Sequence, residues 1–393
     1  MKICAVICEL NPLHNGHRYI FEKAREATGA DRLIALMSGH FVQRGTPAVT
    51  DAYSRAECAL ACGADAVIEL PVVYAVAAAD KFASGAVNIL RTLPVDTLVC
   101  GAESDNGELI DIAAHIRAEE PETYKSALRA CLDSGLSYGR AVTEATAATA
   151  AGQGADGESV RAMLSKPNNI LAVSYRKAIV ETRSDMDFVT IKRAGGDISE
   201  SFSGTFSSAS AIRKILDDDT VSAAMPAKSF EVLRRERKEH FVRSDEFGAL
   251  ILAALRDSAA ERIEDTPDCA EGFSVKIKKL ADSSASFDDF MFSVPTSRFT
   301  RGRIMRICLQ NLLRITKEMQ ASGYNCARLI GVRRGARDIL GLLPQNIITD
   351  VRSESAIPAH WLPCYEAEKR ASDIYSLITH RPAKFRRRLI TAD

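Results

Sequence analysis

Residues 3–17 read ICAVICELNPLHNGH, and this stretch decides the fold, because a short apolar run leads into a polar turn with two histidines. The first six residues are rich in aliphatic side chains and are bounded by polar residues, which predicts a strand buried on both faces. A helix is expected next, because apolar residues recur at helical spacing from 17 to 24 and Gly29 is placed for a left-handed C-cap. His14 and His17 therefore flank a turn from strand to helix.

This turn has the chemistry of a phosphate site. The first turn of a helix offers unpaired backbone N–H groups and the positive end of its dipole. Gly16 lets the backbone come close to a ligand, and the imidazoles of His14 and His17 can donate hydrogen bonds to phosphate oxygens and to charge that develops at an α-phosphorus. Arg18 either adds charge or is solvated. The alternative interpretation is a histidine pair that only caps the helix or lies on the surface.

Further apolar runs extend this unit into an α/β fold. Strands and helices alternate through the first third of the chain, which predicts a Rossmann-like, doubly wound parallel sheet. Ligands bind at the carboxyl ends of strands in such sheets, and polar or glycine-containing segments follow three of them, at 9–17, 38–45 and 101–104. The further predicted strands are 33–37, 66–70, 97–100 and 188–192, and the first predicted helices between them are 54–61 and 76–90.

Two later segments carry further polar groups suited to a nucleotide. Residues 207–213, SSASAIR, place hydroxyl groups at a helix start one turn before Arg213, which can form a second phosphate clamp or a plain cap. Asn168 and Asn169 open another predicted helix, where either can act as N-cap or contact a ligand. Arg193 stands at the end of the fifth predicted strand.

One glycine motif points to a different fold and is rejected. Residues 152–157, GQGADG, satisfy Gly-x-Gly-x-x-Gly, the fingerprint of dinucleotide-binding folds. They follow a helical, Ala-rich run and not a strand, so we interpret them as a loop. No Gly-x-x-x-x-Gly-Lys-Ser/Thr occurs in the chain, which excludes a P-loop enzyme.

Composition sets the class of protein. The chain has 393 residues, of which 46% are hydrophobic, so it can bury a large core. Two domains are expected, 1–217 and 218–393. The formal net charge is zero. The apolar run after Lys2 is too short for a signal peptide, and no run approaches the ~20 residues that a membrane span needs. Ten cysteines without a Cys-x-x-Cys pair predict reduced thiols and a cytoplasmic protein.

The second half is predicted to be mainly helical, with helices at 230–241, 247–263 and 303–321. Ten basic residues and one acidic residue lie in 290–337, and the tail repeats this bias at Arg381, Lys384 and 386–388. Such clusters suit an RNA backbone, although basic runs are often only solvated faces. The basic residues taken as candidates for RNA contact are Arg298, Arg301, Arg303, Arg333 and Arg334.

Taken together, these motifs resemble a known family. His14-Asn15-Gly16-His17 is similar to the His-x-Gly-His signature of nucleotidyltransferases. The chain resembles the bacterial tRNA(Met) cytidine acetate ligases, strongly over residues 1–215 and weakly over the helical remainder. Those enzymes use ATP to activate acetate as acetyl-adenylate and acetylate the wobble cytidine of elongator tRNA(Met). The motifs that carry the resemblance are ELNPLHNGH (9–17), MSGHFVQRGTPA (37–48), IELP (68–71), GAES (101–104), PNNILA (167–172) and SSASAIR (207–213).

The resemblance implies a nucleotide site. In the implied mechanism, His14 and His17 stabilise the transition state at the α-phosphorus, and Ser208 and Arg213 stabilise the leaving pyrophosphate. Gly101, Arg193 and one of the two asparagines, Asn168 or Asn169, complete the pocket. The remaining residues implied to wrap ATP are Ile7, Cys8, Glu9, Leu10, Asn11, Pro12, Leu13, Asn15, Gly16, Arg18, Tyr19 and Ile20.

The substrates and the metal follow from the same resemblance. Gln43 and Arg44 are candidates for holding acetate or the cytidine, or for a structured loop over the site. Mg²⁺ is expected with ATP, but no carboxylate cluster marks protein ligands, so phosphates and water would supply most of them. Two departures from the family pattern stand out: His40 where Asn is expected and Ala172 where Gly is expected.

Two other functions remain open at this level. The chain could adenylylate a phosphorylated metabolite, as small members of the superfamily do, or bind tRNA without catalysis.

Overall fold

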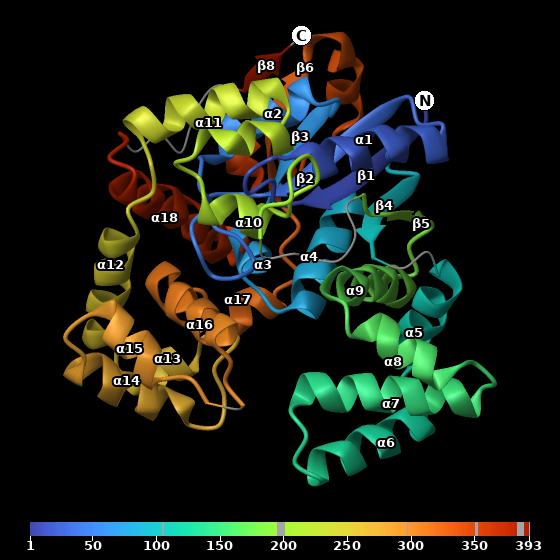
Figure 1. The fold of residues 1–393 in the computed structure, drawn as a ribbon, viewed down its shortest axis with the longest axis vertical. Helices are drawn as coiled ribbons and strands as arrows, with labels where there is room; N and C mark the ends of the chain where they lie inside the picture. Colours follow the sequence, from blue (N-terminus) through green and yellow to red (C-terminus); the bar gives the residue numbers. More distant parts are fainter. Residues whose placement is uncertain (104–105, 195–200, 297, 350–352, 383–388, 393) are drawn as a thin grey trace.

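One mixed sheet forms the centre of the protein (Figure 1). The computed structural model describes residues 1–103, 106–194, 201–296, 298–349, 353–382 and 389–392. Ser104 and the basic tail residues Lys384 and 386–388 lie outside these ranges. Within the described residues the sheet has eight strands in the order β5-β4-β1-β2-β3-β6-β7, and β8 pairs with β6. The strands are β1 Ile3–Cys8, β2 Arg32–Ser38, β3 Ala66–Leu70, β4 Thr97–Ala102, β5 Asp187–Lys192, β6 Ala327–Arg333, β7 Ile347–Ile348 and β8 Ile390–Ala392.

The predicted parallel sheet is confirmed for the first five strands. β1 pairs in parallel with β2 and β4, β2 with β3, and β4 with β5. Every residue of β1 is buried, and its side chains alternate between two apolar cores. Ile3, Ala5 and Ile7 join one core, and the residues between them join the other. This two-sided burial is why the strand reads as a continuous apolar run.

The helices cover both faces and form two lobes beyond the sheet. Figure 1 shows α6–α8 at the lower right and α12–α16 at the lower left. The helices are α1 Asn15–Thr28, α2 Ala52–Ala61, α3 Val72–Ala75, α4 Ala79–Leu90, α5 Gly107–Glu119, α6 Glu122–Asp133, α7 Tyr138–Gly152, α8 Gly157–Leu164, α9 Pro167–Thr182, α10 Ala209–Lys214, α11 Ala227–Glu239, α12 Ser244–Asp257, α13 Ala260–Glu264, α14 Phe273–Ser283, α15 Phe287–Ser293, α16 Arg301–Leu313, α17 Lys317–Ala321 and α18 Leu362–Ile378.

Two predicted helices are interrupted in the structure, and a third begins three residues later than predicted. The segment 76–90 is α4, preceded by the separate short helix α3, and 247–263 divides into α12 and α13. The segment 303–321 divides into α16 and α17, because Arg314 adopts a left-handed conformation with φ of 56° and ends α16. The glycine motif 152–157 connects α7 to α8, so it lies between two helices as predicted.

The second half contributes more than helices. β6 was missed by the sequence analysis, and it adds to the parallel sheet as an antiparallel neighbour of β3. Its charged residue Arg328 is buried and pairs with Glu69 of β3, so it does not mark a solvated face. β7 and β8 also come from beyond residue 217. The two halves of the chain therefore build one sheet together.

Within the described residues, every helix is too short or too polar to cross a bilayer.

Candidate active site

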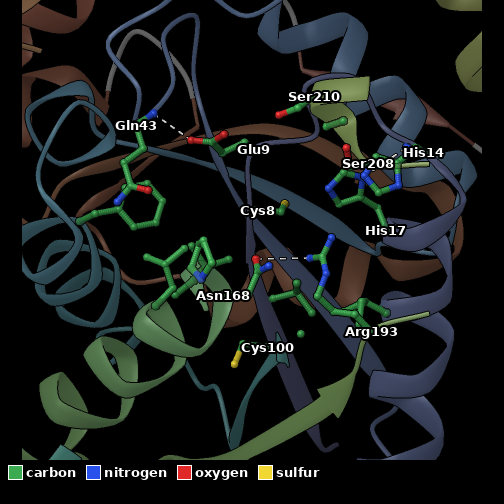
Figure 2. Close-up of a pocket in the computed structure, with 18 of the residues that line it drawn as sticks. Cys8, Glu9, His14, His17, Gln43, Cys100, Asn168, Arg193, Ser208 and Ser210 are labelled. Carbon is green, nitrogen blue, oxygen red and sulfur yellow. Dashed lines mark hydrogen bonds between the residues drawn. The ribbon is translucent and has the colours of Figure 1, made fainter. Parts of the chain in front are cut away.

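A cavity of about 290 Å³ lies at the carboxyl ends of β1 and β4. Its walls come from these strand ends, from α1, α9 and α10, and from the loop after β2. Figure 2 shows His14, His17 and Ser208 close together at one end and Glu9 and Gln43 on another side. Ligands are expected at this edge of a doubly wound sheet.

The two histidines begin α1 and are held by its backbone. His14 is the N-cap, and its Nδ1 accepts a hydrogen bond from the N–H of Gly16 at 3.0 Å. His17 is the third helical residue, and its Nδ1 accepts from the N–H of His14 at 3.2 Å. The pair is thus a capping box made of imidazoles. Because each neutral ring accepts at Nδ1, its proton is on Nε2, which remains as a donor for a ligand.

Burial keeps both imidazoles neutral. Burial is the main cause that lowers the pKa of His14 to about 3, and the charges of Arg193 and Arg213 lower it further. Burial also lowers the pKa of His17 well below its usual value, with the His14 ring and Arg193 as further causes. The ring centroids are 3.9 Å apart. The pair therefore offers two adjacent neutral N–H donors, and the positive charge of the site comes from arginines.

A second set of donors faces the histidines from α10. Ser208 is the N-cap of α10, and its hydroxyl accepts from the N–H of Ala211 at 3.1 Å. Arg213 donates to the carbonyl of Asn11 at 2.6 Å and to the hydroxyl of Ser210 at 3.0 Å. The guanidinium is thus anchored to the turn that precedes α1. Burial lowers its pKa, as does the charge of Arg44.

The opposite wall separates the two asparagines that the sequence left open. Asn168 lines the cavity, and its Oδ1 accepts from the guanidinium of Arg193 at 3.4 Å. Asn169 is fully buried, where it accepts from the N–H of Glu103 at 2.9 Å and donates to the carbonyl of Met163 at 3.1 Å. Asn168 therefore faces the cavity, and Asn169 holds the end of β4 against α9.

The loop after β2 reaches the cavity through Gln43 and Arg44. The N–H of Gln43 donates to Oε1 of Glu9 at 2.8 Å, which ties the loop to the end of β1. Gly45 has a φ of 76°, and a β-carbon there would lie 2.6 Å from the backbone of Met305 in α16. This close approach needs glycine and places α16 directly behind the loop.

The structure brings together about half of the predicted site residues. The residues that line the cavity are Ile7, Cys8, Glu9, His14, His17, Ile20, Gln43, Arg44, Gly101, Asn168, Arg193, Ser208 and Arg213. The predicted residues that do not line it are Leu10, Asn11, Pro12, Leu13, Asn15, Gly16, Arg18, Tyr19 and Asn169.

Most of these excluded residues shape the turn. Leu10 and Leu13 are buried in an apolar core, and the Asn11–Pro12 bond is cis. Asn15 donates to the carbonyls of Thr205 and Ala223 at 3.0 and 3.1 Å, so it joins α1 to the segment that leads into α10. Arg18 is instead exposed and lies 3.2 Å from Glu22.

Several lining residues had no signal in the sequence analysis. Leu171 and Tyr175 are one turn apart on α9 and follow Asn168 on the same helix face, so a helical wheel anchored on Asn168 could have found them. Phe82 comes from α4, and its position depends on how that helix packs. Both departures from the family pattern lie outside the lining: Ala172 is buried, and His40 stacks on Tyr375.

The basic residues proposed for RNA fall in two separate places. Arg301 and Arg303 belong to α16, which packs behind the Gln43 loop, and Arg298 precedes that helix. Arg333 and Arg334 lie at the end of β6, where Val332 pairs with Ala66 at the start of β3. This is the amino-terminal edge of the parallel strands, opposite the cavity.

Metal ligands are scarce. Among the residues that the structure describes, no group of three His, Cys, Asp or Glu side chains could hold a metal ion. Glu9 is the acidic side chain among those lining the cavity.

Comparison with known proteins assigns the family. The model of the family described as HIGH nucleotidyl transferases matches residues 1–388. The tRNA(Met) cytidine acetate ligase of Acetivibrio thermocellus is 34% identical over 91% of this chain and 87% of that protein. The protein of the same name from Caldanaerobacter subterraneus is 36% identical over 96% of this chain and 95% of its own. The chain belongs to the tRNA(Met) cytidine acetate ligase family. The resemblance drawn from the motifs is thereby confirmed.

Solved structures agree with this assignment. The crystal structure of Thermotoga maritima TmcAL without ligand has a TM-score of 0.94 and 33% sequence identity to this chain. The same enzyme bound with alpha-thio ATP has a TM-score of 0.91. Both cover 100% of this chain and 99% of their own. The Rossmann-like nucleotidyltransferase fold is therefore shared over the full length.

Proposed function

We propose that this chain is an ATP-dependent tRNA(Met) cytidine acetate ligase. An oxygen of acetate attacks the α-phosphorus of ATP, and pyrophosphate leaves. The 4-amino group of the wobble cytidine of elongator tRNA(Met) then attacks the carbonyl of acetyl-adenylate, and AMP leaves. The observation that carries the proposal is the pair of neutral imidazoles, which shares one cavity with three guanidinium groups in a chain with the family's fold.

The side chains divide the work of the first step. The Nε2–H groups of His14 and His17 stabilise the charge that grows on the α-phosphoryl oxygens, without any change in their own protonation. Ser208 and Arg213 hold the oxygens of the departing pyrophosphate, because a hydroxyl and an anchored guanidinium are suited to them. Catalysis in this step is then mostly positioning and charge stabilisation.

Mg²⁺ has a limited protein site here. Among the described residues no group of side chains is suited to hold the ion, so the phosphates of ATP and water are expected to supply most ligands. When bound, the ion would neutralise phosphate charge.

The test uses ATP, Mg²⁺, labelled acetate and bulk bacterial tRNA, followed by digestion of the RNA and detection of labelled acetylcytidine. We expect label in tRNA(Met) with the wild-type chain and with His115→Ala, whose histidine lies on α5 away from the cavity. His17→Ala should fail to incorporate it. Pyrophosphate release without labelled RNA would indicate another acceptor, such as a phosphorylated metabolite. The absence of both signals would favour a binding protein without catalysis.

A further inference from the structure

Glu9 is an acidic side chain in the lining of a cavity that is otherwise suited to anions. The other charged side chains in the lining are Arg44, Arg193 and Arg213. Together with the two imidazole donors, they attract phosphates and carboxylates. A carboxylate among them repels both ATP and acetate, so it weakens the binding of each substrate of the activation step. Its presence there calls for a third partner that is not an anion.

The Glu9 side chain is also held in a defined position. Its Oε1 accepts from the N–H of Gln43, while Oε2 makes no hydrogen bond to any residue that the structure describes. The backbone of Glu9 is also fixed, because the buried guanidinium of Arg55 donates to the carbonyls of Glu9 at 2.6 Å and Ser38 at 2.9 Å. One carboxylate oxygen is therefore tied to the loop, and the other is available to a ligand in the cavity (Figure 2).

The other titratable side chains in the cavity are unable to take a proton at neutral pH. Both imidazoles use Nδ1 to accept from the backbone and carry their proton on Nε2. Burial raises the pKa of the Cys8 and Cys100 thiols to about 12, so both are protonated. Burial also raises the pKa of Tyr175 well above its usual value. By elimination, the carboxylate of Glu9 is the basic group on the described walls of this site.

We propose that the carboxylate of Glu9 binds the 4-amino group of the acceptor cytidine and takes its proton during acetyl transfer. This inference rests on the proposed function. The amine nitrogen forms a bond to the acetyl carbon while the bond from that carbon to the phosphate oxygen breaks, and AMP leaves with the electron pair. The proton lost by the nitrogen passes to Glu9 and then to water.

The same contact selects the base. A carboxylate accepts a hydrogen bond from the amino group of cytosine, whereas it repels the O4 carbonyl of uracil. Glu9 therefore acts both in catalysis and in specificity, and it belongs to the acceptor and not to ATP, although it lies in the segment that the family resemblance assigns to the nucleotide.

The test separates the two chemical steps with Glu9→Gln. The amide keeps an oxygen for the N–H of Gln43 but loses the negative charge and the basicity. Enzyme in excess over tRNA is mixed with ATP and labelled acetate, and pyrophosphate release and label in RNA are followed in the same single-turnover reaction. We expect acetate-dependent pyrophosphate release within about threefold of wild type and acetyl transfer slower by roughly 10²- to 10⁴-fold, the usual contribution of a general base.

Specificity gives an independent readout. Wild-type enzyme should bind tRNA(Met) with cytidine at the wobble position about tenfold more tightly than the same RNA with uridine. Glu9→Gln should lose this preference, because its oxygen is held by the N–H of Gln43 and its NH2 group can donate to O4 of uridine but cannot accept from the amino group of cytidine. Glu22→Gln is the matched control: this exposed carboxylate on the outer side of α1 should leave both steps and the preference unchanged.

Three results would overturn the inference. Equal losses of pyrophosphate release and transfer would assign Glu9 to ATP or acetate. Unchanged transfer would exclude a catalytic role. Wild-type enzyme that gives neither pyrophosphate nor labelled RNA would instead remove the proposed function on which the inference rests.

Discussion

Gly16→Ala should separate activity from stability. An ideal β-carbon at Gly16 would lie 2.8 Å from Cε1 and 3.0 Å from Nδ1 of His14. To restore an ordinary contact of 3.4 Å, the ring must retreat by roughly 0.6 Å, which also lengthens its hydrogen bond from the N–H of residue 16. Because the rings of His14 and His17 are in contact, the displacement spreads to both donors.

The substitution should slow the reaction without lowering the stability of the fold. A misplacement of about 1 Å costs on the order of 10²-fold in rate, so we expect acetyl-adenylate formation to slow by about tenfold to a hundredfold. Replacing a helical glycine by alanine stabilises a protein by about 0.4–1 kcal/mol, which offsets the weakened cap. The melting temperature should therefore stay close to that of wild type while activity falls.

The assay is acetate-dependent pyrophosphate release, with a thermal melt of the same preparation. Gly302→Ala is a matched control, because Gly302 is also the second residue of its helix and a β-carbon there would meet nothing within 4 Å. It should gain a little stability and keep full activity. Full activity in Gly16→Ala, or a loss of stability that accounts for its loss of rate, would refute the reasoning.

The remaining predictions concern one donor, pH and RNA. His17→Asn keeps an oxygen for the N–H of His14 but removes Nε2–H, so it should lose roughly 10²- to 10³-fold in kcat without destabilisation; activity within fivefold of wild type would contradict the donor role. Burial lowers the pKa of His14 to about 3 and that of His40 to about 4, whereas both titrate near 6.5 when unfolded, so below pH 6.5 the unfolded state binds more protons. The free energy of unfolding in urea should then fall toward pH 4 by roughly 1.4 kcal/mol per pH unit for each histidine, and an unchanged slope in His40→Asn would contradict this. Arg301→Ala should weaken tRNA binding and lower the slope of log affinity against log salt concentration by about 1. Arg333→Ala should do neither, because its guanidinium pairs with Asp65 at the opposite edge of the sheet. Equal effects of the two substitutions in filter binding would refute this placement of the RNA.

The first four strands could be predicted because each is a short apolar run buried on two faces, a property of the residues themselves, and β5 could be predicted from its β-branched and aromatic residues although it is only half-buried. β6 could not, because Arg328 and Arg333 interrupt its apolar pattern. Their partners, Glu69 and Asp65, are more than 250 residues earlier in the chain. Burial of a charge depends on its partner, and one sequence without contacts does not reveal that partner. The sequence analysis missed Phe82 in the cavity lining for a similar reason, since this side chain reaches the site only through the packing of α4.

The histidine motif shows why a capping role and a functional role need not compete. A capping box requires acceptors at the N-cap and at the third helical residue, which is the spacing of His14 and His17. Serine would satisfy the same backbone donors but has no second polar atom, and asparagine carries its second polar group, the amide nitrogen, on a shorter side chain. Imidazole has a second nitrogen on the far side of the ring, so accepting at Nδ1 fixes the proton on Nε2 and aims a donor beyond the helix. The hydrogen bonds that stabilise the start of α1 thereby also set the protonation of the site, and a substitution that keeps the cap without the second nitrogen should keep the fold and lose the chemistry.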